Sequence, residues 1–533
     1  MSNLGMDSSK PDLQGGFCHS DHLHPILSCQ AASALETSYF KSGLDHEAAA
    51  MERAGRAVAL AIEQSWGERF PHPEDHLPIL LLVGKGHNTG DACLAAMYLA
   101  LRYRQLRFFC LLLYPPEEMR PLTRAAFERF SQSTSELTLI PCSSDTPDRL
   151  TAAFPSFDGI VLDGFLGFNF RPPLSSLHAD LLQLASRIGS EGIRYAVDLP
   201  SGLGDPRAFR ADFTIATGIV KEAVLDPIHK MFVGRLRYAD IGFFADRSSA
   251  VSPTAHWVIS PTILNQLRHL RPPQADKRDF GRIAILAGSD SMPGALIMTV
   301  RAALKAGGGL VTGFSTASAL RAAAPSNPEA MWSENFSEIN NGFEVLVIGP
   351  GLQMPAAAIF EVASNFEGHL VLDAAGLDPD IINHLPPPES RRSLCLTPHP
   401  GELLRLFRTQ SVPPSQTIRE YCQHHQAILV SKDASTRVYT SEMVATSPHG
   451  GPILARGGSG DCLAGIISAL LPRFSHPLPA VLAGVAWQGA TADYFAGTFG
   501  AEGCSTCDWL SQLSGSLRQP PLAIYPPLPK IAL

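Results

Sequence analysis

The sequence lacks the features that would place a chain in a membrane. No apolar run reaches the ~18 residues that a membrane-spanning helix requires, and residues 1–24 have no apolar segment of the kind found in secretion signals. Charged residues make up only 17% of the chain, and the net charge of −8 excludes a general nucleic-acid-binding surface. We therefore expect a cytoplasmic protein with no membrane and no nucleic-acid partner.

The sequence also lacks a cysteine framework. Its ten cysteines are scattered, which is typical of reduced thiols in the cytoplasm. Cys504 and Cys507 form one Cys-x-x-Cys pair, but no second pair or Cys/His set with metal spacing accompanies it. A zinc or redox centre is therefore not expected.

The length of 533 residues predicts two or more domains, because a single core seldom grows beyond about 250–300 residues. The small, polar stretch Ala245–Thr254 marks a boundary. We expect a disordered tail at residues 1–24, a first domain at 25–247, a linker at 248–260 and a second domain at 261–533.

Strand-like and helix-like segments alternate through the first predicted domain. Short apolar runs such as Ile79–Val83, Gly159–Asp163 and Arg194–Asp198 are each followed by a turn and a helical pattern. This alternation predicts an α/β fold with a doubly wound, Rossmann-like parallel sheet, whose ligands bind at the carboxyl ends of the strands.

Polar side chains follow these predicted strands. Asn88 and Asp91 come after the first strand, and Asp163, Asp198 and Ser201 lie at or after the ends of later ones. Because the carboxyl ends of parallel strands meet at one edge of a sheet, we expect these residues to converge on one crevice. Several oxygen ligands together are typical of a cation or sugar-hydroxyl site.

A glycine-rich stretch, Arg456–Asp461, organises the second half and runs into the apolar, helix-like segment Cys462–Leu471. Glycines let the backbone approach a ligand closely, and N–H groups at a helix start can hold a phosphate or oxyanion. Asp461 can take a proton from a substrate hydroxyl there. The pattern favours phosphoryl transfer to an alcohol. The alternative is a glycine-rich turn with an aspartate in the first helical turn.

Further loops of this kind recur in the second half. His399 lies between two prolines after a predicted strand, and Lys432–Thr436 forms a polar turn suited to a nucleotide phosphate. Taken alone, His399 is as well explained as a surface loop residue. In series, these segments predict a second doubly wound sheet with its ligand loops at one edge.

Four motifs of the first half resemble the NAD(P)H-hydrate epimerase (YjeF N-terminal) domain over about residues 25–245. They are Met51–Gly55, the Asn88–Asp91 loop, Asp163–Gly167 and Val197–Gly202. The resemblance implies that Asn88, Asp163 and Ser201 ligate potassium, and that Asp163 or Asp198 is the acid/base residue. It further implies that the hydrated nicotinamide nucleotide is surrounded by His87, Asn88, Thr89, Gly90, Asp91, Gly167, Phe168, Asn169, Phe170, Arg171, Pro172, Pro173 and Asp198.

This chain departs from the family in the first loop. Where the family has Gly-Asn-Asn-Gly-Gly-Asp-Gly, residues 86–92 read Gly-His-Asn-Thr-Gly-Asp-Ala. We expect the added side chains of His87, Thr89 and Ala92 to hinder close approach of a ligand to the backbone.

The second half resembles the NAD(P)H-hydrate dehydratase domain of the ribokinase-like superfamily over about residues 255–530, on Thr397–Glu402 and Gly457–Asp461. The resemblance implies a ribokinase-like sheet and a hydrate site at Ala295, Gly351, His399 and Asp461. It implies adenine-nucleotide contacts by Lys432, Asp433, Ala434, Ser435, Thr436 and Gly460. It also implies that the loop Gly457, Gly458, Ser459, Gly460 stabilises the transferring phosphoryl group, with Asp461 as the base.

The two halves in this order resemble the bifunctional NAD(P)H-hydrate repair enzymes. This implies epimerisation of (R)- and (S)-NAD(P)H hydrate, and ADP-dependent dehydration of the S epimer to NAD(P)H with release of AMP and phosphate. The ligands expected are NAD(P)H hydrate and ADP as co-substrate, with K⁺ in the epimerase domain and Mg²⁺ with the nucleotide. A homo-oligomer is expected.

Two other functions are open on the sequence. A ribokinase-like kinase for a sugar or vitamin alcohol would release a product that keeps its phosphate. A non-catalytic nucleotide-binding protein would fit the altered segments Gly86–Ala92 and Asp373–Leu377, the second of which has Ala375 where the family has a second carboxylate.

Overall fold

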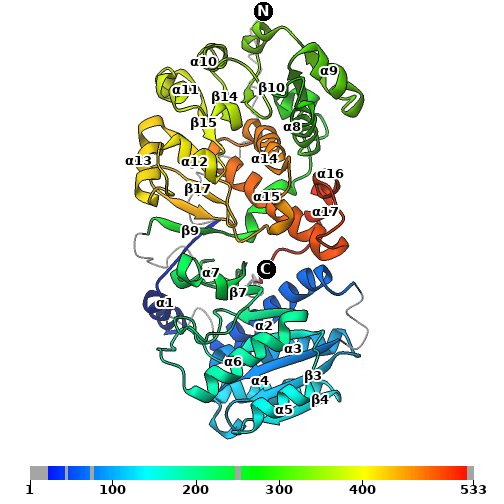
Figure 1. Cartoon of the computed structure of the whole chain (residues 1–533), viewed down its shortest axis with the longest axis vertical. Helices are drawn as coiled ribbons and strands as arrows, with labels where there is room; N and C mark the ends of the chain where they lie inside the picture. Colours follow the sequence, from blue (N-terminus) through cyan, green and yellow to red (C-terminus); the bar gives the residue numbers. More distant parts are fainter. Residues whose placement is uncertain (1–21, 42–45, 72–76, 246–253, 525–533) are drawn as a thin grey trace, which may run out of the picture. The chain divides into compact units, whose positions relative to one another are not determined.

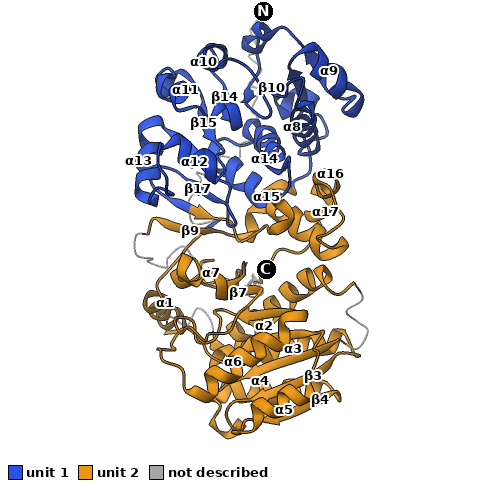
Figure 2. Cartoon of the chain, in the orientation of Figure 1, with its two compact units in different colours: residues 1–23, 269–444, 456–488 blue, residues 24–268, 445–455, 489–533 orange. Residues whose placement is uncertain are grey.

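The computed structural model describes residues 22–41, 46–71, 77–245 and 254–524, and its chain divides into two compact units (Figure 2). Unit 1 comprises Met1–Leu23, His269–Val444 and Arg456–Gln488. Unit 2 comprises His24–Arg268, Ala445–Ala455 and Gly489–Leu533. The units therefore differ from the predicted domains, because unit 2 takes in two segments of the second half of the chain. The division into domains stays a prediction.

Unit 2 is built on a parallel sheet with the strand order β4-β3-β2-β5-β6-β7-β8 (Figure 1). Its strands are β2 (Pro78–Val83), β3 (Arg107–Leu112), β4 (Leu137–Pro141), β5 (Ile160–Gly164), β6 (Ile193–Val197), β7 (Phe213–Thr217) and β8 (Arg235–Ala239). The direction of winding reverses between β2 and β5. A crevice forms at such a reversal, beyond the carboxyl ends of the strands. The predicted doubly wound α/β fold is confirmed.

Helices cover both faces of this sheet. They are α1 (Cys29–Lys41), α2 (Glu47–Ser65), α3 (His87–Arg102), α4 (Pro121–Ser133), α5 (Thr146–Ala153), α6 (Ser176–Ile188) and α7 (Lys230–Val233). In β2, Ile79 and Leu81 pack with α2, α3 and α4, whereas Leu80 and Leu82 pack with α5 and α6. Burial on both faces explains why β2 reads as a continuous apolar run.

Unit 2 also contains strands from distant parts of the chain, in the order β1-β9-β18. They are β1 (Leu23–Pro25), β9 (His256–Ile259) and β18 (Val444–Thr446). Leu23 and Val444 are counted with unit 1, and the other residues of these strands with unit 2. Two predictions are corrected here. Residues 23 and 24 of the predicted tail are part of a strand, and residues 256–259 of the predicted linker form another; residues 1–21 and 248–253 lie outside the described residues.

The late segments of unit 2 are held by a buried ion pair. The unit boundary falls inside α15 (Pro477–Phe499), after which come α16 (Thr506–Leu510) and α17 (Leu513–Ser516). Arg237 Nη2 of β8 lies 2.6 Å from Asp493 Oδ1 of α15. Asp493 Oδ2 also accepts a hydrogen bond from the backbone N–H of Gly450 at 3.1 Å. The ion pair therefore ties Asp493 to β8, and the hydrogen bond ties Gly450 to Asp493.

The strands of the second half of the chain that lie in unit 1 have the order β17-β16-β15-β14-β13-β10-β11-β12. Its strands are β10 (Arg282–Leu286), β11 (Leu310–Phe314), β12 (Met331–Ser333), β13 (Val345–Ile348), β14 (His369–Leu372), β15 (Ser393–Leu396), β16 (Ala427–Ser431) and β17 (Arg437–Tyr439). The pairings are parallel, except that β17 runs antiparallel to β16. The second predicted sheet is therefore present as well.

The helices of unit 1 are α8 (Pro293–Lys305), α9 (Ala317–Ala323), α10 (Ala356–Ser364), α11 (Pro379–His384), α12 (Pro400–Leu406), α13 (Ser415–His425) and α14 (Ser459–Leu470). On one face of the sheet, α10, α11, α12 and α13 pack with the central strands in one apolar core. α14 packs closely on α8. A Cβ added to Gly465 of α14 would lie only 2.3 Å from Thr299 O of α8. In the part of the chain that the structure describes, no helix combines the length and apolarity needed to cross a bilayer.

Candidate active sites

The glycine-rich stretch after β2 is the first turn of a helix. The sequence predicts a loop up to Asp91, but α3 begins at His87 with Gly86 as its N-cap. Thr89 is fully buried, and its Oγ1 donates to Gly164 O at 2.7 Å while accepting from Gly84 N at 2.8 Å. This hydroxyl therefore joins β2 to β5, and it is directed into the core.

The expected hindrance of a ligand is corrected for two of the three altered positions. Thr89 and Ala92 are both 0% exposed. Ala92 packs on Gly164, where an added Cβ would lie 2.5 Å from Ala92 Cβ. Only His87 faces a cavity. Burial and the neighbouring Arg120 lower the pKa of His87, so this imidazole is neutral at pH 7.

A cavity of about 590 Å³ lies at the carboxyl ends of β2, β5 and β6 in unit 2. The predicted residues that line it are His87, Asn88, Asp91, Gly167, Phe168, Asn169 and Asp198. The structure thus brings most of the polar residues after β2 and β6 into one crevice. The predicted residues that do not line it are Thr89, Gly90, Asp163, Phe170, Arg171, Pro172, Pro173 and Ser201.

Asp198 and Lys221 form a buried ion pair in this cavity. Lys221 Nζ lies 2.6 Å from Asp198 Oδ1, with side-chain exposures of 1% and 6%. Asp198 has a φ of 63°, a left-handed conformation that is uncommon outside glycine. Burial alone would lower the pKa of Lys221, but Asp198 and Glu36 outweigh it, and the pKa is raised. The ammonium also lies 5.0 Å from the centre of the Phe168 ring.

Sequence reasoning missed Lys221. The residue follows β7 in the segment Gly218-Ile-Val-Lys, and both apolar neighbours are fully buried. A lysine that directly follows such a buried run is a usable signal, because a buried ammonium needs a carboxylate partner. Its partner lies 23 residues away in the sequence, and only the fold reveals the pair.

Three more carboxyl groups line the same cavity, those of Glu36, Glu47 and Asp91. Burial, with repulsion by Asp198 and Glu36, raises the pKa of Asp91 well above its ordinary value. Burial also raises the pKa of Glu36, a residue of α1 that the sequence did not indicate. The cavity is therefore lined by three cations (Lys41, Arg120 and Lys221) and four carboxyl groups. Two of the carboxyl groups, those of Glu36 and Asp91, bind a proton more readily than usual. Such groups can exchange protons with a bound substrate near neutral pH.

Asp163 lies behind the cavity in a closed network. It is 0% exposed, and its oxygens accept from Ser201 N at 2.7 Å, Ser201 Oγ at 2.6 Å and Phe165 N at 3.2 Å. Burial raises the pKa of Asp163 to about 6, although these hydrogen bonds act to lower it. The carboxyl group therefore fixes the position of the Ser201 turn.

The three predicted potassium ligands lie around this network. Asn88 Nδ2 donates to Leu166 O and to Val197 O, both at 2.9 Å. Ser201 Oγ accepts from Leu166 N at 2.7 Å. Carbonyl, hydroxyl and carboxylate oxygens from three segments thus share one small volume, which is the donor set that hard cations prefer. Among the described residues no group of three or more His, Cys, Asp and Glu could hold a metal ion.

In unit 1, the glycine-rich stretch again begins a helix. α14 starts at Ser459, with Gly458 as its N-cap in a left-handed conformation, φ 88°. The positive φ favours glycine at this position. A Cβ at Gly458 would also lie 2.1 Å from Met298 Sδ of α8, so the end of that side chain would have to move. Asp461 lies in the first turn. Burial, and then Asp373, raise its pKa to about 6. A carboxylate with this pKa can act as a general base near neutral pH.

Lys432 and Asp373 lie beside this helix start. Lys432 Nζ is 2.7 Å from Asp373 Oδ1, and the side chains are 17% and 3% exposed. The same Nζ lies 3.1 Å from the position of a Cβ added to Gly460. Because Gly460 belongs to the first turn of α14, the ammonium adds to the positive end of the helix. The pair and Asp461 are therefore one charged cluster at the predicted anion site.

His399 is the N-cap of α12. Its Nδ1 accepts from Gly401 N at 3.0 Å and from Glu402 N at 3.3 Å, and Glu402 Oε2 accepts from His399 N at 2.8 Å. An accepting Nδ1 places the proton of a neutral ring on Nε2. The ring is 56% exposed, and its Nε2 lies 3.4 Å from Glu402 Oε1, so the Nε2–H is at the surface beside this carboxylate.

The remaining predicted residues of unit 1 lie in two groups. Gly351 has a φ of 60°, and a Cβ there would lie 2.6 Å from Ala295 Cβ, so these two predicted hydrate contacts adjoin at the start of α8. Asp433 and Ala434 are exposed, and Ser435 and Thr436 are half-buried. The turn therefore presents open surface next to Lys432, as a bound nucleotide would need.

Each half of the chain matches a known protein family. A family described as "YjeF-related protein N-terminus" matches residues 47–223, and one described as "NAD(P)H-hydrate dehydratase" matches residues 283–514. A solved structure of an ADP/ATP-dependent NAD(P)H-hydrate dehydratase from Bacillus subtilis, co-crystallised with ATP and Mg²⁺, covers 48% of this chain and 95% of its own, with 24% identity and a TM-score of 0.43.

Curated relatives match both halves at once. The bifunctional NAD(P)H-hydrate repair enzyme Nnr of Gloeobacter violaceus is 31% identical over 502 residues, which are 88% of this chain and 93% of the relative. The enzyme of the same name from Escherichia coli is 30% identical over 81% of this chain and 84% of its own. The match spans nearly the whole of the first relative, and the order of the two halves is the same. The chain therefore belongs to the family of bifunctional NAD(P)H-hydrate repair enzymes.

Proposed function

We propose that unit 2 carries the epimerase site and unit 1 the dehydratase site of a bifunctional NAD(P)H-hydrate repair enzyme. As a member of this family, the chain repairs the hydrated cofactor by epimerisation and dehydration. One observation carries the assignment of the dehydratase site. Asp461, with a pKa of about 6, lies in the first turn of α14 beside Lys432 and Asp373.

In the dehydratase site, Asp461 takes the proton of the C6 hydroxyl as the oxygen attacks the terminal phosphoryl group of ADP. The N–H groups at the start of α14 and the Lys432 ammonium stabilise the charge on that group. AMP leaves, then phosphate departs from C6 and a proton from C5, which restores the ring double bond. Mg²⁺ held with the nucleotide would neutralise its phosphate charge. The exposed His399 ring, whose Nε2 also lies near Glu402 Oε1, would donate its Nε2–H to the substrate.

In the epimerase site, Asp198 and Lys221 act together on the C6 hydroxyl. C6 also carries the ring nitrogen, whose lone pair can form an iminium as the protonated hydroxyl leaves C6 as water. Water then adds to the opposite face of C6 and loses a proton, which gives the other epimer. That exchange needs a group that removes a proton and one that returns it. Asp198 lines the cavity, whereas Asp163 is enclosed behind it. This difference favours Asp198 as the acid/base residue.

Potassium fits the network behind the cavity. Asn88, Asp163 and Ser201 offer oxygens with a single formal negative charge, which suits a monovalent cation better than a divalent one. The amide of Asn88 would turn its oxygen toward the ion, because its nitrogen and oxygen are interchangeable in shape. The ion would hold the Val197–Ser201 turn, and with it Asp198.

The test is recovery of absorbance at 340 nm from a mixed-epimer NADH hydrate preparation with ADP and Mg²⁺. Return of nearly all the hydrate to NADH is expected. A halt at the fraction held by one epimer, after subtraction of spontaneous epimerisation, would remove the epimerase from the proposal. No recovery with ADP or ATP would overturn the proposal. A stable phosphorylated product would then favour the ribokinase-like kinase, and nucleotide binding without turnover would favour the non-catalytic binding protein.

The predicted homo-oligomer, the cytoplasmic location and the choice between ADP and ATP stay predictions. Each has a direct measurement: mass in solution by light scattering, fractionation of cells, and initial rates with either nucleotide.

A further inference from the structure

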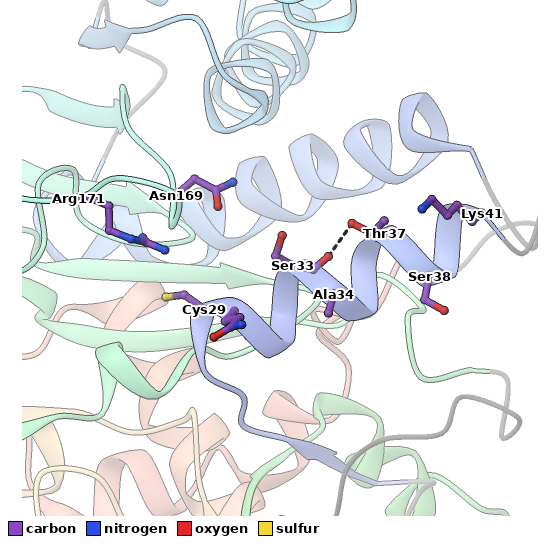
Figure 3. A pocket seen from close by; sticks show the side chains of 9 residues that line it. Cys29, Ser33, Ala34, Thr37, Ser38, Lys41, Asn169 and Arg171 are labelled. Carbon is purple, nitrogen blue, oxygen red and sulfur yellow. Dashed lines mark hydrogen bonds between the residues drawn. The ribbon is translucent and has the colours of Figure 1, made fainter.

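A second cavity, of about 660 Å³, opens on α1 in unit 2 (Figure 3). It is lined by Cys29, Gln30, Ser33, Ala34, Thr37, Ser38, Lys41, Asn169 and Arg171. Ser33, Thr37, Lys41 and Asn169 also line the cavity that holds Asp198 and Lys221. The two cavities therefore meet along one face of α1, on which residues 33, 37 and 41 recur at helical spacing.

The charge of the second cavity is of one sign. Its lining contains the cations Lys41 and Arg171 and no carboxylate, whereas the first cavity contains several acids. The hydroxyls of Ser33 and Ser38 add two donors, while Thr37 Oγ1 already donates to Ser33 O at 2.8 Å. A lining of cations and hydroxyls is suited to an anion such as a phosphoryl group.

The two cations are available to a ligand. Arg171 Nη1 donates to Phe168 O at 3.2 Å and to Phe170 O at 2.8 Å, which orients the guanidinium. Its Nε and Nη2 make no hydrogen bond within the described part of the chain. Lys41 forms no ion pair with any described residue. Figure 3 shows Arg171 near Cys29 and Lys41 at the other end of α1, so each cation would meet a different phosphoryl group.

We propose that the second cavity binds the phosphate-bearing adenosine half of the dinucleotide, with Lys41 and Arg171 in contact with phosphoryl oxygens. The inference rests on the proposed epimerase site. With the hydrated ring at Asp198 and Lys221, the other half of the substrate needs a cationic surface continuous with the first cavity. The resemblance to the family includes Arg171 but no residue of α1, so Lys41, Ser33 and Ser38 are new contacts. The phosphoryl groups are the shared pyrophosphate or the 2′-phosphate of the NADPH form.

The test compares Lys41→Gln and Arg171→Gln in the full-length enzyme, with NADH hydrate and NADPH hydrate as separate substrates of epimerisation. Each variant is expected to raise KM at least fivefold with kcat within twofold of the parent. An equal rise for both substrates assigns the cation to the pyrophosphate, and a rise confined to NADPH hydrate assigns it to the 2′-phosphate. Lys41→Arg should restore most of the loss. Arg104→Gln, an exposed cation that lines neither cavity, is the matched control.

Cys29 gives a second readout that needs no turnover. Its half-buried thiol lines the second cavity, so bound NADPH should slow its alkylation at least threefold, as measured by peptide mass spectrometry. The half-buried thiol of Cys142, which lines neither cavity, should be unaffected. The double variant Lys41→Gln/Arg171→Gln should lose the protection of Cys29.

The outcomes separate this proposal from the function on which it rests. Unchanged KM values together with unprotected Cys29 would overturn it, as would a fall in kcat alone. A parent enzyme without epimerase activity would overturn the proposed function, whereas protection of Cys29 by NADPH that depends on Lys41 and Arg171 would still support the phosphoryl site.

Discussion

The Lys221 ammonium lies 2.6 Å from the Asp198 carboxylate, and both side chains are buried. Removal of one partner from such a pair leaves an uncompensated charge, whereas replacement of both by neutral groups costs much less. The pair thus has a structural and a chemical role, and a double substitution separates them.

Lys221→Met should destabilise the enzyme by about 3–5 kcal/mol, because it leaves Asp198 buried without its partner. Lys221→Met/Asp198→Asn should recover most of that stability but no epimerase activity. Thermal unfolding and the 340 nm assay measure the two effects. In either variant that stays folded, recovery should stop at the fraction of the usable epimer. Epimerase activity in the folded double variant would contradict the role of the pair.

Asp461→Asn should lower the dehydratase rate by about 10²–10⁴-fold, the usual contribution of a general base. The amide keeps the size of the side chain and the start of α14. Binding of ADP should therefore be retained, as measured by calorimetry, and epimerisation in unit 2 should continue. Glu442→Gln, at an exposed carboxylate of unit 1, is the control. A variant as active as the parent would exclude Asp461 as the base.

The pH dependence of dehydration should follow the same carboxyl group. Burial raises the pKa of Asp461 to about 6. A protonated carboxyl group cannot accept the substrate proton, so the rate should fall as the pH drops below about 6 and level off above it. The measurement is kcat/KM for the usable epimer from pH 5 to 8. A flat profile over this range would mean that another group limits the reaction.

Gly458→Ala should strain the start of α14. A left-handed conformation costs a residue with a Cβ roughly 1–2 kcal/mol, and the new methyl would displace the flexible end of the Met298 side chain. We expect a loss of at least this size in the free energy of unfolding, measured with urea, and a lower dehydratase rate. Gly457→Ala is the matched control, because nothing lies within 4 Å of its added Cβ. Equal stability of the two variants would refute the steric argument.

Thr89→Gly, which restores the residue of the family loop, should not improve epimerisation. Thr89 is buried and bonds Gly84 and Gly164, so its loss should cost about 1–3 kcal/mol for the unpaired groups. His87→Asn changes the only altered residue that faces the cavity and should change KM instead. Faster epimerisation by Thr89→Gly would restore the idea that this side chain obstructs the ligand.

Local chemistry explains what the sequence could predict. The strand positions follow from short apolar runs buried on both faces, and Asp461 is recognisable because its glycines, its helix and its carboxylate are adjacent. Lys221 and Glu36 could not be assigned from neighbours, because the fold alone brings them to Asp198. The strand β9 was taken for a linker because it pairs with segments that are distant in the sequence.

The side chains of the first loop show the same limit. In sequence, Thr89 and Ala92 are additions to a glycine-rich turn. In the structure they belong to a helix, and their direction is set by its 3.6-residue period. Pattern alone does not reveal that the helix already begins at His87, inside the glycine-rich stretch.

The chain returns to unit 2 after it has built most of unit 1, and this has a consequence for attempts to separate the two activities. A single cut between residues 245 and 254 would leave Asp493 and Gly450 on one fragment and Arg237 on the other. The first fragment would lack part of its own interior, and the second would carry apolar segments without their cover. Such pieces should stay associated after cleavage and should aggregate when expressed apart. Because unit 2 contains segments from both sides of this cut, one cut cannot separate the two activities.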